Sequence, residues 1–319
     1  MLRRSLDMLA KQARQGARQI SAGLQHEARG QAAVQGVGQW QAGLAISPQG
    51  ARRYHLYRPR GASPQQRLPL LVMLHGCGQD AQGFAALTRM NRLAERHRFL
   101  VLYPEQDLLA NPQRCWNWFE TRHGRAEREA ASILAAIDQV CRQQPVDARN
   151  IAVAGLSAGA SMAALLALQA PARFKAVVMH SGVTPEAANS PLSALRAMRG
   201  RRHQPAAIDP AAPSLPALLV IQGAQDHTVD ASNGPAAAHG WVAGTGAVAR
   251  PVRVLQRGRR YPMVVTEFKL GLRTLATWVQ VQGLGHAWSG GAAREPFSDP
   301  QGPDASKLIW AFAARHFVG

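Results

Sequence analysis

Short, continuous runs of apolar residues alternate with amphipathic stretches along the chain from residue 52 onward. Five runs have the length and continuity of buried strands, at 68–74, 99–103, 151–154, 176–179 and 218–221. Between them, residues 83–97, 126–143 and 158–169 carry apolar positions at helical spacing. Uninterrupted apolar strands separated by helices are typical of a mostly parallel central sheet with helices on both faces. We therefore predict an α/β fold.

The pattern changes toward both ends of the chain. Residues 262–281 alternate between polar and apolar positions around Gly271, which predicts a hairpin or paired strands before a C-terminal helix at about 303–316. The stretch 30–50 is rich in glycine, alanine and glutamine and is interpreted as a linker. We therefore expect an N-terminal extension with its linker at residues 1–48 and one domain at residues 49–319.

Residues 1–25 have the periodicity of an amphipathic, basic helix. Their apolar positions recur at steps of three and four, at Leu2, Leu6, Leu9, Ala13, Ala17, Ile20 and Leu24. Such a helix can bind a granule or another anionic surface, or it can pack on its own domain or form a mobile tail. The segment lacks the continuous apolar stretch of a secretory signal, which favours a cytoplasmic or granule-associated protein. No apolar run reaches the roughly 18 residues of a membrane-spanning helix.

Composition narrows the class of protein. The chain has 319 residues, of which 46% are hydrophobic and 18% charged. These proportions fit a globular core and exclude a chain that is disordered throughout. The 37 basic and 19 acidic residues give a formal net charge of +18, so a basic, non-catalytic binding protein is an alternative hypothesis. Because the arginines are scattered and no zinc-finger, RNP or basic-zipper pattern is present, we expect no specific nucleic-acid function.

Cysteine usage excludes two further classes. Three cysteines, Cys77, Cys115 and Cys141, are too few for a disulfide-rich mini-fold and allow at most one intrachain bridge. No CxxC or HxxxH spacing indicates a structural zinc site, so we expect neither a metal nor another cofactor.

The sequence Gly155-Leu156-Ser157-Ala158-Gly159 follows one predicted strand and precedes a predicted helix. A nucleophilic serine at a strand-to-helix turn needs small neighbours, because the turn is tight and its backbone is strained. The following helix directs backbone N–H groups toward developing negative charge. This context makes Ser157 the candidate nucleophile.

A serine nucleophile in such a sheet requires an acid and then a base later in the chain. Asp226 lies just past the strand at 218–221, and His286 lies in the glycine-rich loop that follows residues 276–281. In this arrangement the histidine accepts the proton of Ser157, and the aspartate fixes the tautomer of the imidazole. We therefore predict a Ser157, Asp226 and His286 triad.

Other acids and bases border the same strand ends. Asp230 lies farther along the loop than Asp226, and Asp209 precedes the strand. His75, His180 and His227 are each near a strand end, but only His286 comes late enough to match the expected order.

An acyl-transfer site also needs donors for the oxyanion. The backbone N–H of Ala158, directly after the nucleophile, is one expected donor. The turn after the strand at 68–74 should supply the other, and we assign it to the backbone N–H of Cys77. Gly76 and Gly78 on either side allow this turn to approach a substrate closely.

With His75-Gly76-Cys77, the Ser157 pentapeptide and the stretch 283–291 in place, the sequence resembles the polyhydroxybutyrate (PHB) depolymerase family of esterases. Residues 103–106 (Tyr-Pro-Glu-Gln) and 115–119 (Cys-Trp-Asn-Trp-Phe) resemble further motifs of that family. The resemblance covers about residues 52–290. It implies an α/β-hydrolase fold that cleaves esters of short hydroxyalkanoates, with related members acting on feruloyl and acetyl esters of plant polysaccharides. The family's nucleophile, acid and base map onto Ser157, Asp226 and His286, and its oxyanion turn maps onto Cys77.

The resemblance leaves several points open. Substrates range from hydroxybutyrate oligomers or polymer to small aryl and alkyl esters, and extracellular relatives make export an alternative to the cytoplasm. Trp116, Trp118 and Trp288 either line a substrate groove or pack in the core. Cys77 and Cys115 lie in motifs that can meet near the site, either as a bridge or as reduced thiols. The sequence does not fix the oligomeric state.

Overall fold

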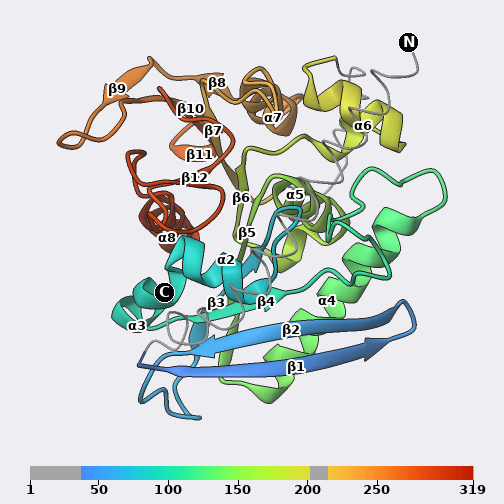
Figure 1. Cartoon of the computed structure of the whole chain (residues 1–319). Coiled ribbons are helices and arrows are strands. Elements are labelled where there is room, and N and C mark those ends of the chain that lie inside the picture. The colour runs from blue at the N-terminus through green and yellow to red at the C-terminus, as the bar shows by residue number, and fades with distance from the viewer. Residues whose placement is uncertain (1–36, 202–214, 319) are drawn as a thin grey trace.

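The computed structural model describes residues 37–201 and 215–318. Its strands are β1 (Gln39–Ser47), β2 (Gly50–Arg58), β3 (Leu68–Leu74), β4 (Leu100–Pro104), β5 (Val146–Leu156), β6 (Ala176–His180), β7 (Ala217–Gly223), β8 (Val248–Ala249), β9 (Arg253–Leu255), β10 (Met263–Leu270), β11 (Arg273–Val281), β12 (Trp288–Ser289) and β13 (Ser298–Asp299). The first eleven form one sheet in the order β1-β2-β4-β3-β5-β6-β7-β11-β10-β8, with β9 also paired to β10 (Figure 1). β12 and β13 pair separately.

The centre of the sheet is parallel and its two sides are antiparallel. β4, β3, β5, β6, β7 and β11 are neighbours that all run in one direction. β1 and β2 extend one side in antiparallel pairing, and β10, β8 and β9 extend the other. The five predicted strands and the predicted hairpin around Gly271 are thereby confirmed. Because parallel strands end at the same edge, the loops after β3, β5, β7 and β11 meet there.

Helices cover both faces of the sheet, as the apolar strands require. They are α2 (Ala81–Thr88), α3 (Met90–His97), α4 (Arg125–Gln143), α5 (Ala158–Gln169), α6 (Pro191–Met198), α7 (Asn233–Val242) and α8 (Ala305–His316), with short 3-10 turns η1 (Pro171–Arg173) and η2 (Pro185–Ala187). One buried apolar cluster joins α4, α5 and α7 to the sheet. A second cluster joins α2, α3 and α8 to it from the opposite face. The helices predicted at 126–143 and 158–169 and the C-terminal helix are confirmed.

The single helix predicted at 83–97 is wrong. The structure has α2 and α3 instead, separated by Arg89, whose φ of 54° is in the left-handed region. The N–H of Arg89 still donates to Ala85 O, and the Thr88 hydroxyl donates to Phe84 O, but the left-handed backbone of Arg89 ends α2 at Thr88. The apolar spacing continues across the break because both helices pack on the same face of the sheet.

The linker interpretation is wrong for the second half of residues 30–50. Residues 39–47 form β1, which pairs along its whole length with β2, so the expected boundary at residue 48 falls inside a hairpin. β1 is mostly exposed, and its Ala45 is its buried residue. Its apolar residues are separated by glutamine and glycine and mostly remain exposed, so the stretch lacks the continuous apolar run that indicates a buried strand. The amphipathic stretch 1–25 lies outside the described residues. No helix in the described part of the chain is long and apolar enough to span a bilayer.

Candidate active site

Ser157 lies at the turn between β5 and α5. Its φ of 56° and ψ of −122° form the strained elbow expected of a nucleophile. Both flanking glycines are required by close backbone contacts. A Cβ on Gly155 would lie 2.2 Å from the Gly159 carbonyl, and one on Gly159 would lie 2.3 Å from Leu74 O on β3. The turn can therefore form only with glycine at these two positions.

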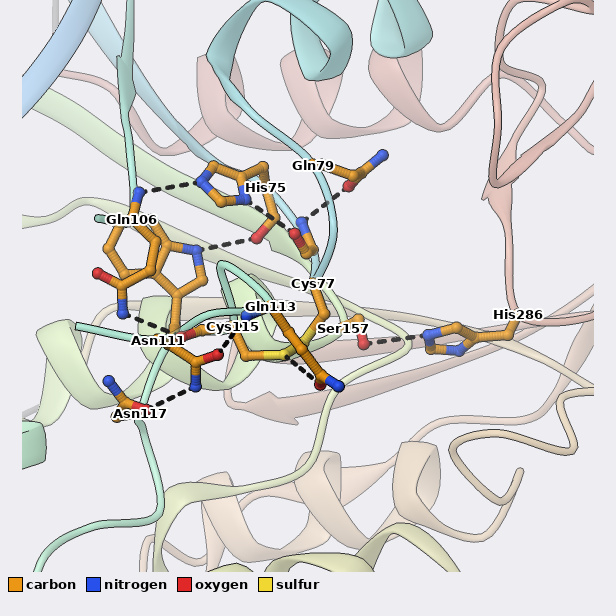
Figure 2. The surroundings of a disulfide bond; sticks show 12 residues. His75, Cys77, Gln79, Gln106, Asn111, Gln113, Cys115, Asn117, Ser157 and His286 are labelled. Atoms are coloured by element: carbon orange, nitrogen blue, oxygen red, sulfur yellow. Dashed lines mark hydrogen bonds between the residues drawn. A yellow bond between two sulfur atoms is a disulfide. The ribbon is translucent and has the colours of Figure 1, made fainter. Parts of the chain in front are cut away.

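A chain of hydrogen bonds joins the three residues predicted as a triad. His286 Nε2 lies 3.0 Å from Ser157 Oγ, and His286 Nδ1 lies 2.8 Å from Asp226 Oδ2. With Asp226 ionised, the Nδ1–H donates to the carboxylate, which leaves Nε2 to accept the proton of the serine. The His286 side chain is 15% exposed and that of Asp226 is fully buried. The histidine is thus partly exposed on the side of Ser157, and Figure 2 shows the bond between these two residues.

The carboxylate of Asp226 accepts hydrogen bonds on both oxygens. Oδ1 accepts the backbone N–H groups of Thr228 and Val229, at 3.0 and 2.8 Å. Oδ2 accepts His286 and also Gln222 Nε2, at 3.1 Å. Burial alone would raise the pKa of Asp226, but the bond to His286, its charge and the two amides outweigh burial, so the pKa is lowered. The acid is therefore ionised and held in one orientation.

Two backbone N–H groups are available to hold an oxyanion. The N–H groups of Cys77 and Ala158 donate to no protein group in the described residues. A Cβ on Gly76 would lie 3.6 Å from Ser157 Cβ, so the turn that carries Cys77 runs directly beside the nucleophile (Figure 2). This placement fits the donor roles expected of Cys77 and Ala158.

His75 orients the peptide that bears the Cys77 N–H. Its Nδ1 lies 2.8 Å from the carbonyl oxygen of Gly76, and its Nε2 accepts the backbone N–H of Gln106 at 3.1 Å. Because Gly76 O and Cys77 N–H belong to one trans peptide unit, they point in opposite directions, and a bond to the first fixes the second. Burial lowers the pKa of His75 to about 4, so the ring is neutral and can make both bonds.

A second segment supports the same turn. A disulfide joins Cys77 to Cys115, and Gly78 N donates to Gln113 O at 2.7 Å. The bridge settles the alternative that the sequence left open, and it places the 111–117 loop against the oxyanion turn (Figure 2). Cys141, on α4, is a free thiol.

The three tryptophans do not line a groove, so that expectation is wrong. Trp116 and Trp288 are fully buried and Trp118 is 4% exposed. Trp116 Nε1 donates to His75 O, and Trp288 Nε1 donates to the Ser306 hydroxyl. Both indoles therefore support the site from behind through packing and hydrogen bonds.

Two further buried residues hold the site together: Gln222, which sequence reasoning missed, and His180, which it considered only as a competing base. Gln222 on β7 bonds to Asp226. His180 at the end of β6 accepts Ser157 N–H on its carbonyl at 2.8 Å and Ser289 N–H on Nε2 at 3.2 Å. Burial, with the charge of His286 acting in the same direction, lowers the pKa of His180 to about 3, so its ring is neutral. The competing Asp230 caps the turn at Ser232, whose backbone N–H donates to Asp230 Oδ1 at 2.9 Å.

No group of three His, Cys, Asp or Glu side chains within residues 37–201 and 215–318 is placed to hold a metal ion.

A family model described as esterase PHB depolymerase matches residues 52–248. The chain belongs to this family. The matched segment contains the oxyanion turn, Ser157 and Asp226, while His286 lies beyond it and is placed by its hydrogen bonds alone. The family resemblance predicted from the motifs is confirmed.

Curated relatives of the family match parts of the chain. Poly(3-hydroxyalkanoate) depolymerase C of Paucimonas lemoignei is 33% identical over 175 residues, which are 52% of this chain and 42% of that protein. Feruloyl esterase B of Neurospora crassa is 30% identical over 117 residues, 36% of this chain and 39% of the relative. Acetylxylan esterase A of Emericella nidulans is 28% identical over 134 residues, 41% and 42% of the two chains. The matches thus span about two fifths of each relative's length.

Solved structures share the fold. An acetyl xylan esterase from Aspergillus awamori superposes with a TM-score of 0.65 at 18% identity, covering 78% of this chain and 94% of its own. An esterase of Pyrobaculum calidifontis gives a TM-score of 0.56 at 20% identity, covering 88% and 86%. At these identities the likeness establishes the architecture, which is the predicted α/β-hydrolase fold.

Proposed function

We propose that this protein is a serine ester hydrolase in which Ser157 is the nucleophile, His286 the general base and Asp226 the acid that orients it. The observation that supports this proposal is the continuous Ser157–His286–Asp226 hydrogen-bond chain beside two unpaired N–H groups. Ester hydrolysis needs these elements together: an activated hydroxyl, a proton acceptor and donors for a developing oxyanion.

The first half of the reaction forms an acyl-enzyme. Ser157 Oγ attacks the ester carbonyl while its proton passes to His286 Nε2, and the carbonyl oxygen becomes an oxyanion that accepts the N–H groups of Cys77 and Ala158. Asp226 stabilises the imidazolium that results. When the tetrahedral intermediate collapses, the C–O bond to the alcohol breaks, and His286 returns the proton to the departing oxygen.

The second half releases the acid. A water molecule takes the position of the alcohol and loses a proton to His286 Nε2 as its oxygen attacks the acyl carbon. The same two amides hold the second oxyanion. Collapse breaks the bond to Ser157 Oγ, which recovers its proton from His286, and the free carboxylic acid leaves. One histidine therefore serves as base and acid in each half.

For the substrate, we propose esters of short hydroxyalkanoic acids, as oligomer, polymer or small aryl and alkyl esters. The family model and the depolymerase of Paucimonas lemoignei support this class. A feruloyl or acetylxylan ester is the second candidate, because relatives named for those activities match at 28–30% identity. Initial rates on hydroxybutyrate oligomers, feruloyl esters and acetylated xylan under one set of conditions separate the two. A higher kcat/KM on feruloyl or acetyl esters than on hydroxybutyrate oligomers would make the second candidate the preferred substrate class.

The test of the reaction class is hydrolysis of a short-chain p-nitrophenyl ester by the wild-type protein and by Ser157→Ala. We expect the variant to lose at least about 10³-fold in kcat while its circular dichroism spectrum is unchanged. Ser47→Ala, at the exposed β1–β2 turn, is the matched control and should keep full activity. Equal rates for wild type and Ser157→Ala would refute the assignment. The absence of hydrolysis combined with steeply salt-dependent DNA binding would favour the non-catalytic basic protein instead.

We also propose that residues 1–25 help the protein bind a polymer granule or an anionic surface, on the basis of their apolar and basic periodicity. Replacing Leu6 and Leu9 by glutamate in the full chain interrupts the apolar stripe. Partition onto amorphous polyhydroxybutyrate granules should fall while esterase activity in solution is retained. Unchanged partition would remove this role.

A further inference from the structure

The segment 248–259 forms an arm along the outer edge of the sheet. It contains β8 and β9, yet every one of its twelve residues is exposed. Val252, Val254 and Leu255 are 58%, 69% and 41% exposed. β9 pairs on one side with β10 and carries exposed side chains on both faces, and in Figure 1 it extends away from the body of the molecule.

The composition of the arm is aliphatic and basic. Its sequence is Val-Ala-Arg-Pro-Val-Arg-Val-Leu-Gln-Arg-Gly-Arg, with no acidic and no aromatic residue. Arg253 pairs with Glu267 of β10 at 3.2 Å. The guanidinium groups of Arg257 and Arg259 have no hydrogen-bond or ion-pair partner among the residues that the structure describes. The arm therefore presents uncompensated positive charge beside exposed valine and leucine.

The register of the strands places part of this arm at the edge of the sheet that carries the active site. Leu255 pairs with Met263, Met263 with Val281, and Val281 with Gly223. Gly223 and Val281 are the last residues of β7 and β11, after which Asp226 and His286 follow. Three strand spacings of about 4.8 Å separate β9 from β7. A surface bound by the arm would thus lie roughly 15 Å to the side of the triad.

We propose that residues 248–259 are a docking surface for an anionic lipid layer. Arginine binds lipid phosphate, and neighbouring aliphatic side chains enter the headgroup region, so the two residue types act together on a lipid surface. An alternative is that the arginines only keep this sheet edge from aggregating. That role needs charge alone and leaves the exposed valines and leucine unexplained. A single-stranded nucleic acid would be bound through arginine with aromatic stacking, and the arm has no aromatic residue.

The test is co-sedimentation of the full-length protein with vesicles of phosphatidylcholine mixed with phosphatidylglycerol, compared with phosphatidylcholine alone. The double variant Arg257→Ser and Arg259→Ser should reduce partition onto the anionic vesicles by about 10- to 30-fold, because each arginine near the surface contributes about three- to fivefold. The double variant Val252→Thr and Val254→Thr keeps the side-chain shape and should reduce partition by about threefold. Hydrolysis of a soluble ester should be unchanged in both.

The matched control is Arg92→Ser and Arg96→Ser, which removes the same charge from exposed positions of α3. Its partition should stay within about twofold of wild type after general charge effects are screened with salt. Equal losses in the arm and control variants would show that net charge alone drives binding and would overturn the proposal. So would unchanged partition of the arm variants, or loss of single-stranded DNA binding with vesicle binding intact. None of these readouts depends on catalysis, so they are independent of the proposed function.

Discussion

Gln222 Nε2 donates to Asp226 Oδ2, the same carboxylate oxygen that accepts the His286 ring N–H. The amide group is fully buried on β7 and donates a second bond to Val229 O at 3.0 Å. Gln222 therefore fixes both the carboxylate and the loop that follows it. In the proposed mechanism it is a positioning residue that acts through Asp226.

Replacing Gln222 by methionine tests this positioning role. The substitution keeps the length of the side chain but removes the donor, so we expect kcat to fall about 10- to 100-fold, the range for one hydrogen bond to a charged group. KM should change little, since Gln222 is fully buried. Gln280→Met is the control: it pairs with Gln222 across β7 and β11 but makes no bond to Asp226. A fall in KM and kcat together, or an equal loss in the control, would mean a general packing effect.

Asp226→Asn tests the identity of the acid. The amide cannot hold the imidazole in the tautomer that accepts the serine proton, and kcat should fall about 10⁴-fold, as for the equivalent change in serine proteases. Asp230→Asn is the natural comparison, because it lies in the same loop and its Oδ1 accepts the N–H of Ser232. We expect Asp230→Asn to keep most of its activity. A larger loss of kcat in Asp230→Asn than in Asp226→Asn would assign the acid of the triad to Asp230 instead.

The sequence was sufficient to predict the parallel strands and the order of Ser157, Asp226 and His286. Strands buried on both faces must be continuously apolar, and a nucleophile elbow must have glycine where backbones touch. Other features depend on tertiary contacts that leave no local pattern. Arginine is a good helix former, so nothing in the composition signals the left-handed turn at Arg89. Gln222 is a single polar residue at the end of an apolar strand, and only the folded loop reveals its partner.

The tryptophans illustrate the same limit. The sequence does not distinguish a tryptophan that faces a substrate from one that packs in the core. Trp116 is buried because its ring lies under Arg52, at 5.2 Å from the guanidinium, and because its N–H is satisfied by His75 O. Neither partner is near it in sequence, so no spacing rule could have placed it.

The disulfide should contribute to both stability and rate. Cys77 and Cys115 close a loop with a sequence separation of 38, for which the chain-entropy model gives about 4 kcal/mol. We expect the double variant Cys77→Ser and Cys115→Ser to unfold at lower urea concentration. Its kcat should fall at least about tenfold, because the oxyanion N–H of Cys77 is less firmly held.

Cys141→Ser separates the bridge from thiol chemistry in general. Cys141 is the free thiol, and it lies far from the turn in the sequence. This variant should match wild type in kcat, and dithiothreitol should lower the rate of wild type and Cys141→Ser alike while leaving the bridge-less variant unaffected. Insensitivity of the wild-type rate to complete reduction would contradict a positioning role for the bridge.

Substitution of glycine by alanine should have opposite effects on stability at Gly159 and at Gly240. A Cβ on Gly159 would lie 2.3 Å from Leu74 O and 2.4 Å from His75 O, both backbone atoms that cannot move aside. Gly159→Ala should therefore lower the free energy of unfolding by roughly 3 kcal/mol or more and abolish activity. Gly240 lies in α7 with nothing within 4 Å of an added Cβ, and Gly240→Ala should stabilise by about 0.5–1 kcal/mol. Urea unfolding of both variants measures the contrast, and similar destabilisation by both would contradict this geometry.

His75 makes the stability of the fold depend on pH. Burial lowers its pKa to about 4, although the bond to Gly76 and the charge of Asp80 act in the opposite direction. In the unfolded chain the pKa of the imidazole returns to about 6.5. Between pH 4 and 6.5 the unfolded state therefore binds a proton that the folded state does not. Stability from this group is therefore lost as pH falls from about 6.5 to 4, at up to roughly 1.4 kcal/mol per pH unit.

His75→Gln should be less stable than wild type at neutral pH, because it loses the ring's two hydrogen bonds, and the gap should narrow as pH falls through this window. Urea unfolding of the two proteins at intervals from about pH 7.5 to 4.5 gives the gap directly, and other titrating groups common to both cancel. His227→Gln, an exposed histidine next to Asp226, is the control and should follow wild type throughout. A gap between wild type and His75→Gln that stays constant over this range would show that His75 is not held neutral in the folded protein. The ring would then be protonated in the folded state, and its Nε2 could not accept the N–H of Gln106.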